Sequence, residues 1–151
     1  VYFNEIEIEN HLKELMQIDY QLNWTSKNIS TVYVNVMLAE DVMTFNGTLN
    51  IRLQNGGKYV NFGNQDFDCN GMSMVYNHFL FQIIVVSLRA YSNFPLSCPL
   101  RKNKLYYLNG FKIETDIVRS YFPEVSFETD AKLIYNQRLA VHVVTKGQLV
   151  R

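Results

Sequence analysis

The stretch Met16–Trp24, MQIDYQLNW, decides the fold because its apolar and polar residues alternate with a period of two. The apolar parity holds Met16, Ile18, Tyr20, Leu22 and Trp24, and the polar parity holds Gln17, Asp19, Gln21 and Asn23. Successive side chains of a β-strand point to opposite faces of the sheet, so the alternation predicts a strand with one buried face and one solvated face.

The same alternation recurs along the chain and predicts about seven or eight strands. With little helix to cover them, such strands bury their apolar faces mainly against one another. This predicts a mostly β, two-sheet antiparallel sandwich in a single domain spanning residues 1–151. The expected strands cover residues 1–9, 16–24, 31–38, 43–53, 58–67, 104–117, 125–135 and 139–143.

The connections between these strands follow from their turn residues. Asn55-Gly56-Gly57 predicts a tight hairpin, because these residue types tolerate positive φ. Gly47 interrupts no apolar parity, so it is expected to form a bulge or bend inside its strand. The polar stretch Thr25–Ser30 is expected to be a loop, and a turn is expected at Gln137-Arg138.

One segment, Asn77–Tyr91, departs from the alternation. Its apolar residues Leu80, Ile84 and Leu88 recur at helical spacing, although the β-branched run 83–86 locally favours a strand. The length of the segment and the lost alternation predict a buried helix. Because apolar residues surround this helix, we expect it to pack across the sandwich and to be covered on more than one side.

Charge and hydropathy exclude several classes of partner. Lysine plus arginine and aspartate plus glutamate number 14 each, so the chain has no basic surface for nucleic acid. The longest apolar run, Phe79–Leu88, is too short to span a bilayer. The chain begins at Val1 without an initiator methionine or apolar leader, which we interpret as a mature or trimmed product.

Three N-glycosylation acceptor triplets favour a secreted protein, beginning at Asn23, Asn28 and Asn46. Asn23 and Asn46 lie on the polar parity of their strands and Asn28 lies in the expected loop, so all three are expected to be solvent-accessible. On these triplets and the cysteine pair described next, we expect a secreted, extracellular glycoprotein.

Cys69 and Cys98 are the only cysteines, and they flank the apolar segment. They form either one disulfide or two buried free thiols. A disulfide would close a loop of about 30 residues and contribute roughly 3–4 kcal/mol through loop entropy. We favour the disulfide, with bonding geometry between the two residues.

The sequence offers little for catalysis. His11, His78 and His142 share no metal-ligand spacing with one another or with the cysteines. Asp66 and Asp68 are best interpreted as a charged strand end, and the glycines form turn dipeptides rather than a phosphate-binding loop. We therefore expect no enzyme activity, no cofactor and no metal.

The remaining candidate for function is the apolar material between the sheets. Interiors pack to high density by default, so a filled core is the simpler interpretation and a cavity needs further argument. The residues expected to converge there, and to line any apolar cavity, are Phe45, Leu49, Ile51, Phe79, Phe81, Ile84, Val85, Leu88, Phe111, Ile113, Phe127 and Leu133.

A family resemblance supplies that argument, and it extends from about Ile6 to the C-terminus. The motifs that carry it are Asn46-Gly47-Thr48-Leu49, Gly56-Gly57, Phe67-Asp68-Cys69, Tyr91-Ser92-Asn93, Ser97-Cys98-Pro99 and Gly110-Phe111-Lys112-Ile113. In these motifs the chain resembles a large insect family of secreted proteins of unassigned function. That family is distantly similar to the myeloid-differentiation-related lipid-recognition (ML) superfamily and includes the chemosensory B proteins.

The resemblance implies an immunoglobulin-like β-sandwich that holds an apolar ligand between its sheets, a Cys69–Cys98 bridge, and a role in insect chemosensation or pheromone detection. Many relatives carry further cysteines in the first third of the chain, whereas this chain has none before Cys69. Without such cysteines, its N-terminal strands are expected to be held in place less firmly.

Two functions follow as expectations. The first is a secreted, non-catalytic binder of a lipid or other apolar small molecule in a cavity between two sheets. The alternative is an extracellular protein-interaction domain with a filled core, acting as an accessory to a membrane receptor or channel. A cavity of several hundred Å³ favours the first function.

Overall fold

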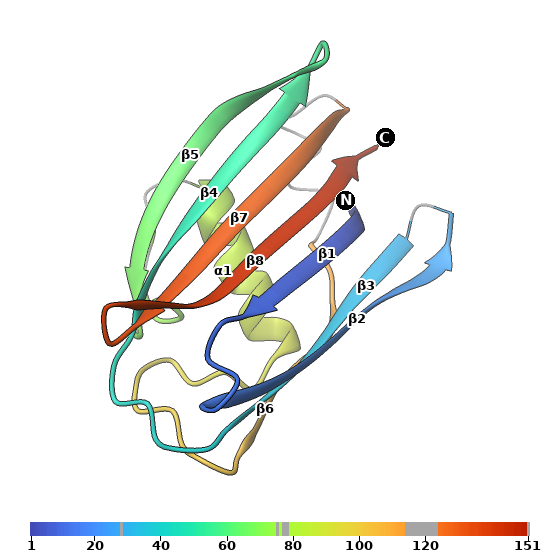
Figure 1. Cartoon of the computed structure of the whole chain (residues 1–151). Helices are drawn as coiled ribbons and strands as arrows, with labels where there is room; N and C mark the ends of the chain where they lie inside the picture. The colour runs from blue at the N-terminus through green and yellow to red at the C-terminus, as the bar shows by residue number, and fades with distance from the viewer. Residues whose placement is uncertain (28, 75, 77–78, 114–123, 151) are drawn as a thin grey trace.

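A computed structural model describes residues 1–27, 29–74, 76, 79–113 and 124–150. Within these ranges eight strands form two antiparallel sheets, a five-stranded sheet in the order β1-β8-β7-β4-β5 and a three-stranded sheet in the order β2-β3-β6, accompanied by one helix (Figure 1). The predicted mostly β, two-sheet sandwich with one helix is confirmed. The elements are β1 (Tyr2–Asn10), β2 (Met16–Ser26), β3 (Ile29–Leu38), β4 (Asn46–Asn55), β5 (Lys58–Asp68), α1 (Phe79–Tyr91), β6 (Leu105–Phe111), β7 (Val125–Tyr135) and β8 (Arg138–Leu149).

Two tight turns connect neighbouring strands of the large sheet. Between β4 and β5, Gly56 and Gly57 have φ angles of 68° and 94°, as the predicted hairpin requires. Between β7 and β8, Asn136 and Gln137 occupy the same left-handed region with φ of 50° and 64°. This second turn therefore lies one residue before the expected Gln137-Arg138.

The expected bulge or bend at Gly47 is wrong, because Gly47 is a regular position of β4. The register shift of the β4–β5 pair falls later, between Ile51 and Arg52. A Cβ atom at Gly47 would lie 2.6 Å from the Phe67 ring and 2.6 Å from the Lys132 carbonyl oxygen. The glycine is needed because the ring of its cross-strand partner lies flat against the backbone.

Several expected boundaries also change; the last strand, expected to end at residue 143, runs to Leu149. The expected loop Thr25–Ser30 is instead a short hairpin, since β2 runs to Ser26 and β3 begins at Ile29. The expected strand 104–117 ends as β6 at Phe111, and residues 114–117 lie outside the described residues. At Thr25–Ser30 polar residues were expected to mark a loop, and at 104–117 apolar parity was expected to mark a strand, whereas backbone pairing decides where a strand ends.

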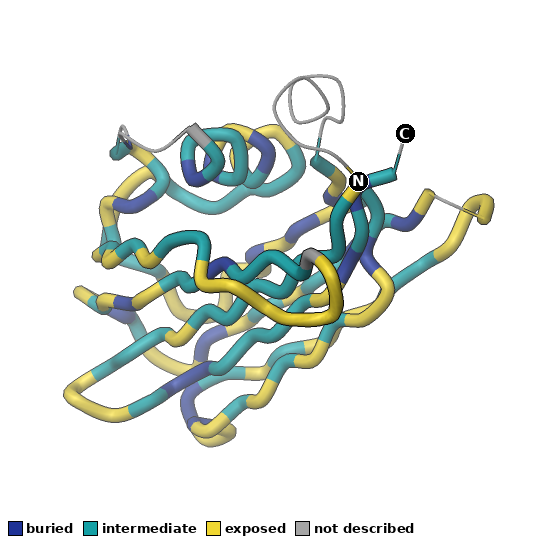
Figure 2. Tube along the Cα trace, turned by 90° about the horizontal axis from the view of Figure 1, so that it is seen from above, coloured by how far each residue is buried: buried dark blue, intermediate teal, exposed yellow. Residues whose placement is uncertain are grey.

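The core divides into two parts because two different elements cover the five-stranded sheet. The three-stranded sheet packs over the β1–β8–β7 side and buries, among others, Leu38, Val141 and Phe111. Helix α1 packs over the β4–β5 side, where Phe81 and Val85 contact Ile51. Figure 2 shows the helix lying over the strands, with buried positions along its length. The helix therefore takes the place of a further strand in the smaller layer.

The backbone after α1 joins the helix to β6. The Asn93 side chain accepts a hydrogen bond from the Tyr107 backbone N–H (2.7 Å) and donates one to the Leu105 carbonyl (2.8 Å). Ser92 and Leu108 form an isolated antiparallel bridge. These bonds satisfy backbone N–H and carbonyl groups along the edge of β6 and hold the end of α1 beside the three-stranded sheet.

Ser30 joins the two sheets at the opposite edge. Its hydroxyl accepts a hydrogen bond from the Phe3 N–H (2.8 Å) and donates one to the Phe3 carbonyl (2.9 Å). Ser30 is 2% exposed, so these bonds satisfy buried backbone groups of β1 with a side chain of β3.

The opening stretch Met16–Trp24 forms β2 as predicted, but its apolar face is only partly covered. Tyr20 and Trp24 are 42% and 48% exposed. Strand β2 is an edge strand of the smaller sheet, so part of its inward face extends beyond the opposite layer. Trp24 is partly shielded there by the Tyr2 ring, whose centroid lies 5.6 Å away.

Candidate functional site

An apolar cavity lies between α1 and the inner face of the five-stranded sheet. Its volume is about 50 Å³, and apart from Thr129 its lining is entirely apolar. We call it the α1 cavity. It is lined by Val1, Ile51, Leu53, Leu80, Ile84, Ile113, Val125, Phe127, Thr129 and Leu149.

The cavity runs inward from one end of the sheet. Val125 and Leu149 are cross-strand partners at that end, and Tyr2 pairs with Gln148 beside them. Both chain termini lie at this end in Figure 1. Thr129 lies four residues further along β7, which corresponds to about 13 Å of extended strand. The cavity therefore extends from the end of the sandwich that holds both termini toward the middle of the sheet.

Helix α1 supplies the wall that faces the sheet. Phe81 and Val85 are 3% and 8% exposed and pack onto Ile51, whereas Leu80 and Ile84 are half-buried and line the cavity. Val86 is 52% exposed. The helix is thus covered on two sides, in line with the expected cover on more than one side, and is open to solvent on the third.

The sequence-predicted cavity residues separate into different parts of the core. Ile51, Ile84, Ile113 and Phe127 line the α1 cavity. Leu49, Phe81 and Val85 pack in the core cluster behind it. Phe111 and Leu88 belong to the cluster around Phe3, and Phe45 and Leu133 to the cluster around Leu38. Phe79 begins α1, and its side chain lies outside the described residues.

Sequence reasoning missed the other lining residues. Leu53 and Val125 lie on the apolar parity of strands that were predicted, so that parity was the available signal. Thr129 occupies the same parity of β7, where a hydroxyl interrupts an apolar series. A polar residue on a buried parity was the signal that could have singled it out.

Cys69 directly follows β5, and Cys98 lies in the connection after α1. Both are free thiols in this structure, and their side chains form a hydrogen bond. The predicted disulfide is therefore not formed here and stays a prediction. Burial raises the pKa of Cys98 to about 12, and the hydrogen bond to Cys69 adds to the rise. For Cys69 burial also acts upward, but hydrogen bonds from the Cys98 side chain and the Phe45 backbone leave its pKa below the ordinary value.

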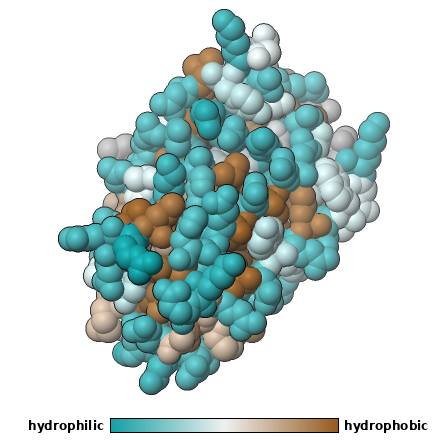
Figure 3. All heavy atoms as spheres, viewed as in Figure 1, coloured by the Kyte–Doolittle hydropathy of each residue, from teal (hydrophilic) through white to brown (hydrophobic). Residues whose placement is uncertain are grey.

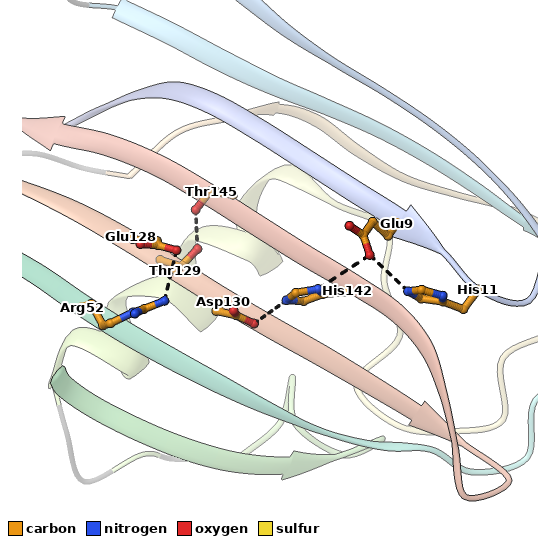
Figure 4. Close-up of polar contacts among 8 residues, drawn as sticks. All are labelled: Glu9, His11, Arg52, Glu128, Thr129, Asp130, His142 and Thr145. Carbon is orange, nitrogen blue, oxygen red and sulfur yellow. Dashed lines mark hydrogen bonds and ion pairs between the residues drawn. The ribbon is translucent and has the colours of Figure 1, made fainter. Parts of the chain in front are cut away.

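The outer face of the five-stranded sheet carries a polar network (Figure 4). His142 Nε2 lies 2.7 Å from Asp130 Oδ1, and His142 Nδ1 lies 3.9 Å from Glu9 Oε2. Arg52 Nη2 lies 3.2 Å from Glu128 Oε1. Figure 3, viewed from the same side as Figure 1, shows mainly hydrophilic residues on this face with hydrophobic ones between them. The network links neighbouring strands across a solvated surface.

No metal-binding arrangement emerges within the described residues. No three or more His, Cys, Asp or Glu side chains among them converge to hold a metal ion. A surface groove of about 340 Å³ lies near the Gly56-Gly57 turn, bounded by side chains such as Gln54 and Gln148. In the part of the chain that the structure describes, α1 is too short and too mixed in polarity to cross a membrane.

The glycosylation acceptors differ in their surroundings. Asn46 is exposed at the start of β4, and Asn23 is half-buried on β2. Asn28 lies outside the described residues, but the Ser30 of its triplet is buried. Asn46 therefore meets the expectation of accessibility most fully.

Comparison with known proteins yields a family match and similar solved structures. Residues 45–129 match the model of a family described as "Protein of unknown function (DUF1091)". This match confirms the expected relationship to a family without an assigned function. No curated protein matches the chain.

A solved structure of a Niemann-Pick type C2 protein from Japanese carpenter ant is similar over 97% of this chain and 90% of that chain. The sequence identity is 13% and the TM-score is 0.33. The architecture described above therefore rests on this chain's own strand pairing.

Proposed function

Because the chain belongs to the DUF1091 family of proteins of unknown function, we propose a function from its own geometry: it is a non-catalytic binder of an apolar small molecule in the α1 cavity. The observation that carries this proposal is a cavity with an almost wholly apolar lining between α1 and the five-stranded sheet. Transfer of apolar ligand surface from water into such a lining contributes roughly 25 cal/mol per Å².

The volume of the cavity sets a condition on this function. About 50 Å³ holds about two water molecules at roughly 30 Å³ each, whereas small-molecule pockets commonly measure about 300–1,000 Å³. A lipid-sized ligand therefore requires α1 to move away from the sheet. The helix is suited to this movement because its lining residues Leu80 and Ile84 are only half-buried.

A matched pair of variants on α1 tests the proposal. Ile84→Glu places a charge in the cavity lining, where no partner is available, and should abolish binding of a fluorescent fatty-acid probe. Val86→Glu lies two residues away on the exposed side of the same helix and should leave binding unchanged. Probe titration and circular dichroism are measured on both variants and on the parent.

A filling variant keeps the test informative if Ile84→Glu fails to fold. Ile84→Phe adds apolar volume to the cavity without adding charge, and should weaken probe binding while the protein remains folded. If the parent protein binds no apolar probe, or if Ile84→Phe and Val86→Glu weaken binding equally, the binding proposal is wrong.

The second candidate is an extracellular protein-interaction domain with a filled core, an accessory to a membrane receptor or channel. The small cavity volume favours it, and so do exposed apolar residues on the outer face of the three-stranded sheet. Met37 and Leu105 are direct cross-strand partners there, and Tyr107 lies two residues along β6. Their exposures are 38%, 47% and 38%. A parent protein that binds no probe leaves this candidate standing.

Secretion and glycosylation complete the proposal. Support comes from the acceptor triplets and from the exposure of Asn46. Expression in insect cells should give protein in the medium whose mass falls on enzymatic deglycosylation, and Asn46→Gln should remove one glycan. The role in insect chemosensation and pheromone detection rests on the sequence resemblance alone.

A further inference from the structure

The surface groove of about 340 Å³ lies at the end of the five-stranded sheet that holds the β4–β5 turn and both chain termini (Figure 1). We call it the end groove. It is shallow and open to solvent, and its volume falls within the range of about 300–1,000 Å³ that is common for small-molecule sites. The end groove therefore has room for a small ligand in the conformation that the structure shows.

Three polar residues from neighbouring strands line the end groove side by side. Gln54 of β4, Ser126 of β7 and Gln148 of β8 are consecutive cross-strand partners, and all three belong to the lining. Each alternates along its strand with a residue that lines the α1 cavity, so the three lie on the outer face of the sheet. Val125 and Leu149, at the strand ends, border both spaces. The end groove is therefore a separate site from the α1 cavity.

These three side chains have unused hydrogen-bonding capacity. Within the described residues, no hydrogen-bond partner is found for the side chain of Gln54 or Ser126. Gln148 Oε1 accepts one hydrogen bond from the Tyr2 hydroxyl, at 2.6 Å, and its amide N–H groups are not used by that bond. A glutamine amide donates and accepts, and so does a serine hydroxyl. The groove thus presents donors and acceptors next to one another.

The charge of the lining selects the kind of ligand. Among the described lining residues, Glu124 is the one ionised side chain, and none is Lys, Arg or His. An anionic ligand would therefore meet no cation, and a purely apolar ligand would leave the amides and the hydroxyl without partners. A neutral ligand rich in hydroxyl groups fits this lining, because each hydroxyl donates one hydrogen bond and accepts two.

Aromatic rings flank the polar row at both of its ends. Tyr59 of the edge strand β5 pairs with Gln54, and Tyr2 of the opposite edge strand β1 pairs with Gln148. Tyr59 is exposed, and so is Trp24, whose ring centroid lies 5.6 Å from that of Tyr2. Four strand spacings separate the two tyrosines, which corresponds to about 19 Å. Sugar rings combine hydroxyl groups with a face of C–H groups, and such a face packs against aromatic rings.

We propose that the end groove binds a neutral saccharide. The two glutamine amides and the serine hydroxyl form hydrogen bonds with its hydroxyl groups. Sugar units that extend beyond the groove pack against the tyrosines at the ends of the row. This binding goes beyond the proposed function of the α1 cavity and does not depend on it.

The test is a titration of the ¹⁵N-labelled full chain with three neutral probes, maltotriose, cellotriose and N,N′,N″-triacetylchitotriose, followed by ¹H–¹⁵N NMR. At least one probe should shift the side-chain amide signals of Gln54 and Gln148. Gln54→Ala should weaken binding of that probe roughly three- to tenfold, as expected for the loss of one or two hydrogen bonds. The matched control is Asn64→Ala, which removes an exposed amide from β5 on the same face but outside the groove. It should bind like the parent.

Two charged probes test the choice of a neutral ligand: chitotriose, which carries ammonium groups, and a sulfated heparin disaccharide. Tighter binding of either one than of the neutral probes would overturn the proposal. It is also wrong if no neutral probe shifts the groove signals, if the shifts map to another surface, or if Asn64→Ala weakens binding as much as Gln54→Ala. None of these results affects the α1 cavity, because displacement of an apolar probe measures that site separately.

Discussion

The two parts of the core differ in what covers the same five-stranded sheet. On the β1–β8–β7 side, strands β2, β3 and β6 lie opposite, and their residues Leu38 and Phe111 are buried to 3% and 7% exposure. On the β4–β5 side, α1 lies opposite, and a cavity of about 50 Å³ remains between helix and sheet. The alternating side chains of two sheets interdigitate closely, whereas the rounded surface of a helix meets a twisted sheet less evenly.

This difference assigns separate tasks to the two parts. The sheet-on-sheet part is tied by the Ser30 hydrogen bonds and by dense apolar clusters, so it holds the fold together. The helix-on-sheet part contains the apolar lining and the two cysteines that flank α1. We expect substitutions in the first part to change stability and substitutions in the second part to change binding.

The largest expected effect is in the sheet-on-sheet part. Phe111 packs against Phe3 and Tyr91, with ring centroids 5.8 Å and 6.4 Å away. It does not line the α1 cavity, so Phe111→Ala should lower the free energy of unfolding by the full cost of about 3–5 kcal/mol. Urea denaturation followed by fluorescence measures this loss. A loss below about 2 kcal/mol would mean that this side of the sandwich is also hollow.

Oxidation of the cysteine pair should sharpen the contrast by fixing α1 to the end of β5. The closed loop spans about 30 residues, so a disulfide should raise the free energy of unfolding by roughly 3–4 kcal/mol. Cys98→Ser should remove that gain under oxidising conditions and change little under reducing conditions. Two free thiols titrating in unreduced, secreted protein would contradict the bridge and weaken the secretory assignment.

A matched pair of truncations compares the two parts directly. Leu38→Ala leaves a new void in a filled cluster and should cost about 3–4 kcal/mol, whereas Ile84→Ala enlarges a space that already exists and should cost about 2 kcal/mol. Ile84→Ala should also retain or tighten probe binding. Equal costs, measured by denaturation of both variants, would remove the distinction between the two parts.

The smallest expected effect lies outside both parts, at the loop that begins after β3. The Asp41 Oδ1 atom accepts a hydrogen bond from the Lys102 backbone N–H at 2.9 Å. This bond, with the Arg101 and Lys102 charges nearby, lowers the pKa of Asp41 below its ordinary value of 3.8. The ionised form therefore stabilises the fold above about pH 4, and this contribution is lost as the pH falls through the lowered pKa.

Asp41→Asn removes the charge and keeps the acceptor oxygen. The variant should be slightly less stable than the parent at neutral pH, and the difference should vanish in strong acid. Thermal unfolding at pH 7 and pH 2.5 measures both states. A difference that grows toward acid would contradict the sign of the pKa shift.

The family match concerns ancestry and not function. Family membership brings no function with it, because the matching family is itself described as of unknown function. The binding experiments on α1 therefore carry the functional question. Their outcomes do not depend on the stability series above.

The sequence alone determined the elements and their faces. The alternation of β2 and β4, the helical spacing of Leu80, Ile84 and Leu88, and the Gly56-Gly57 turn all reflect local periodicity or allowed φ, which neighbouring residues in the chain suffice to specify. The parity of His142 likewise placed it on the outer face of the sheet, where it contacts Asp130. Such properties are readable because they arise within one strand, helix or turn.

Only the tertiary structure decided which element covers each face. The alternation predicts that Ile51 and Phe111 point inward. The layer packed opposite determines that Ile51 faces the α1 cavity and that Phe111 packs in a filled cluster beneath strands. The exposure of Tyr20 and Trp24 has the same origin, since an edge strand extends beyond the opposite layer. Thr129 and Thr145 meet for the same reason: strand register joins residues that are far apart in the chain, and no local pattern encodes that register.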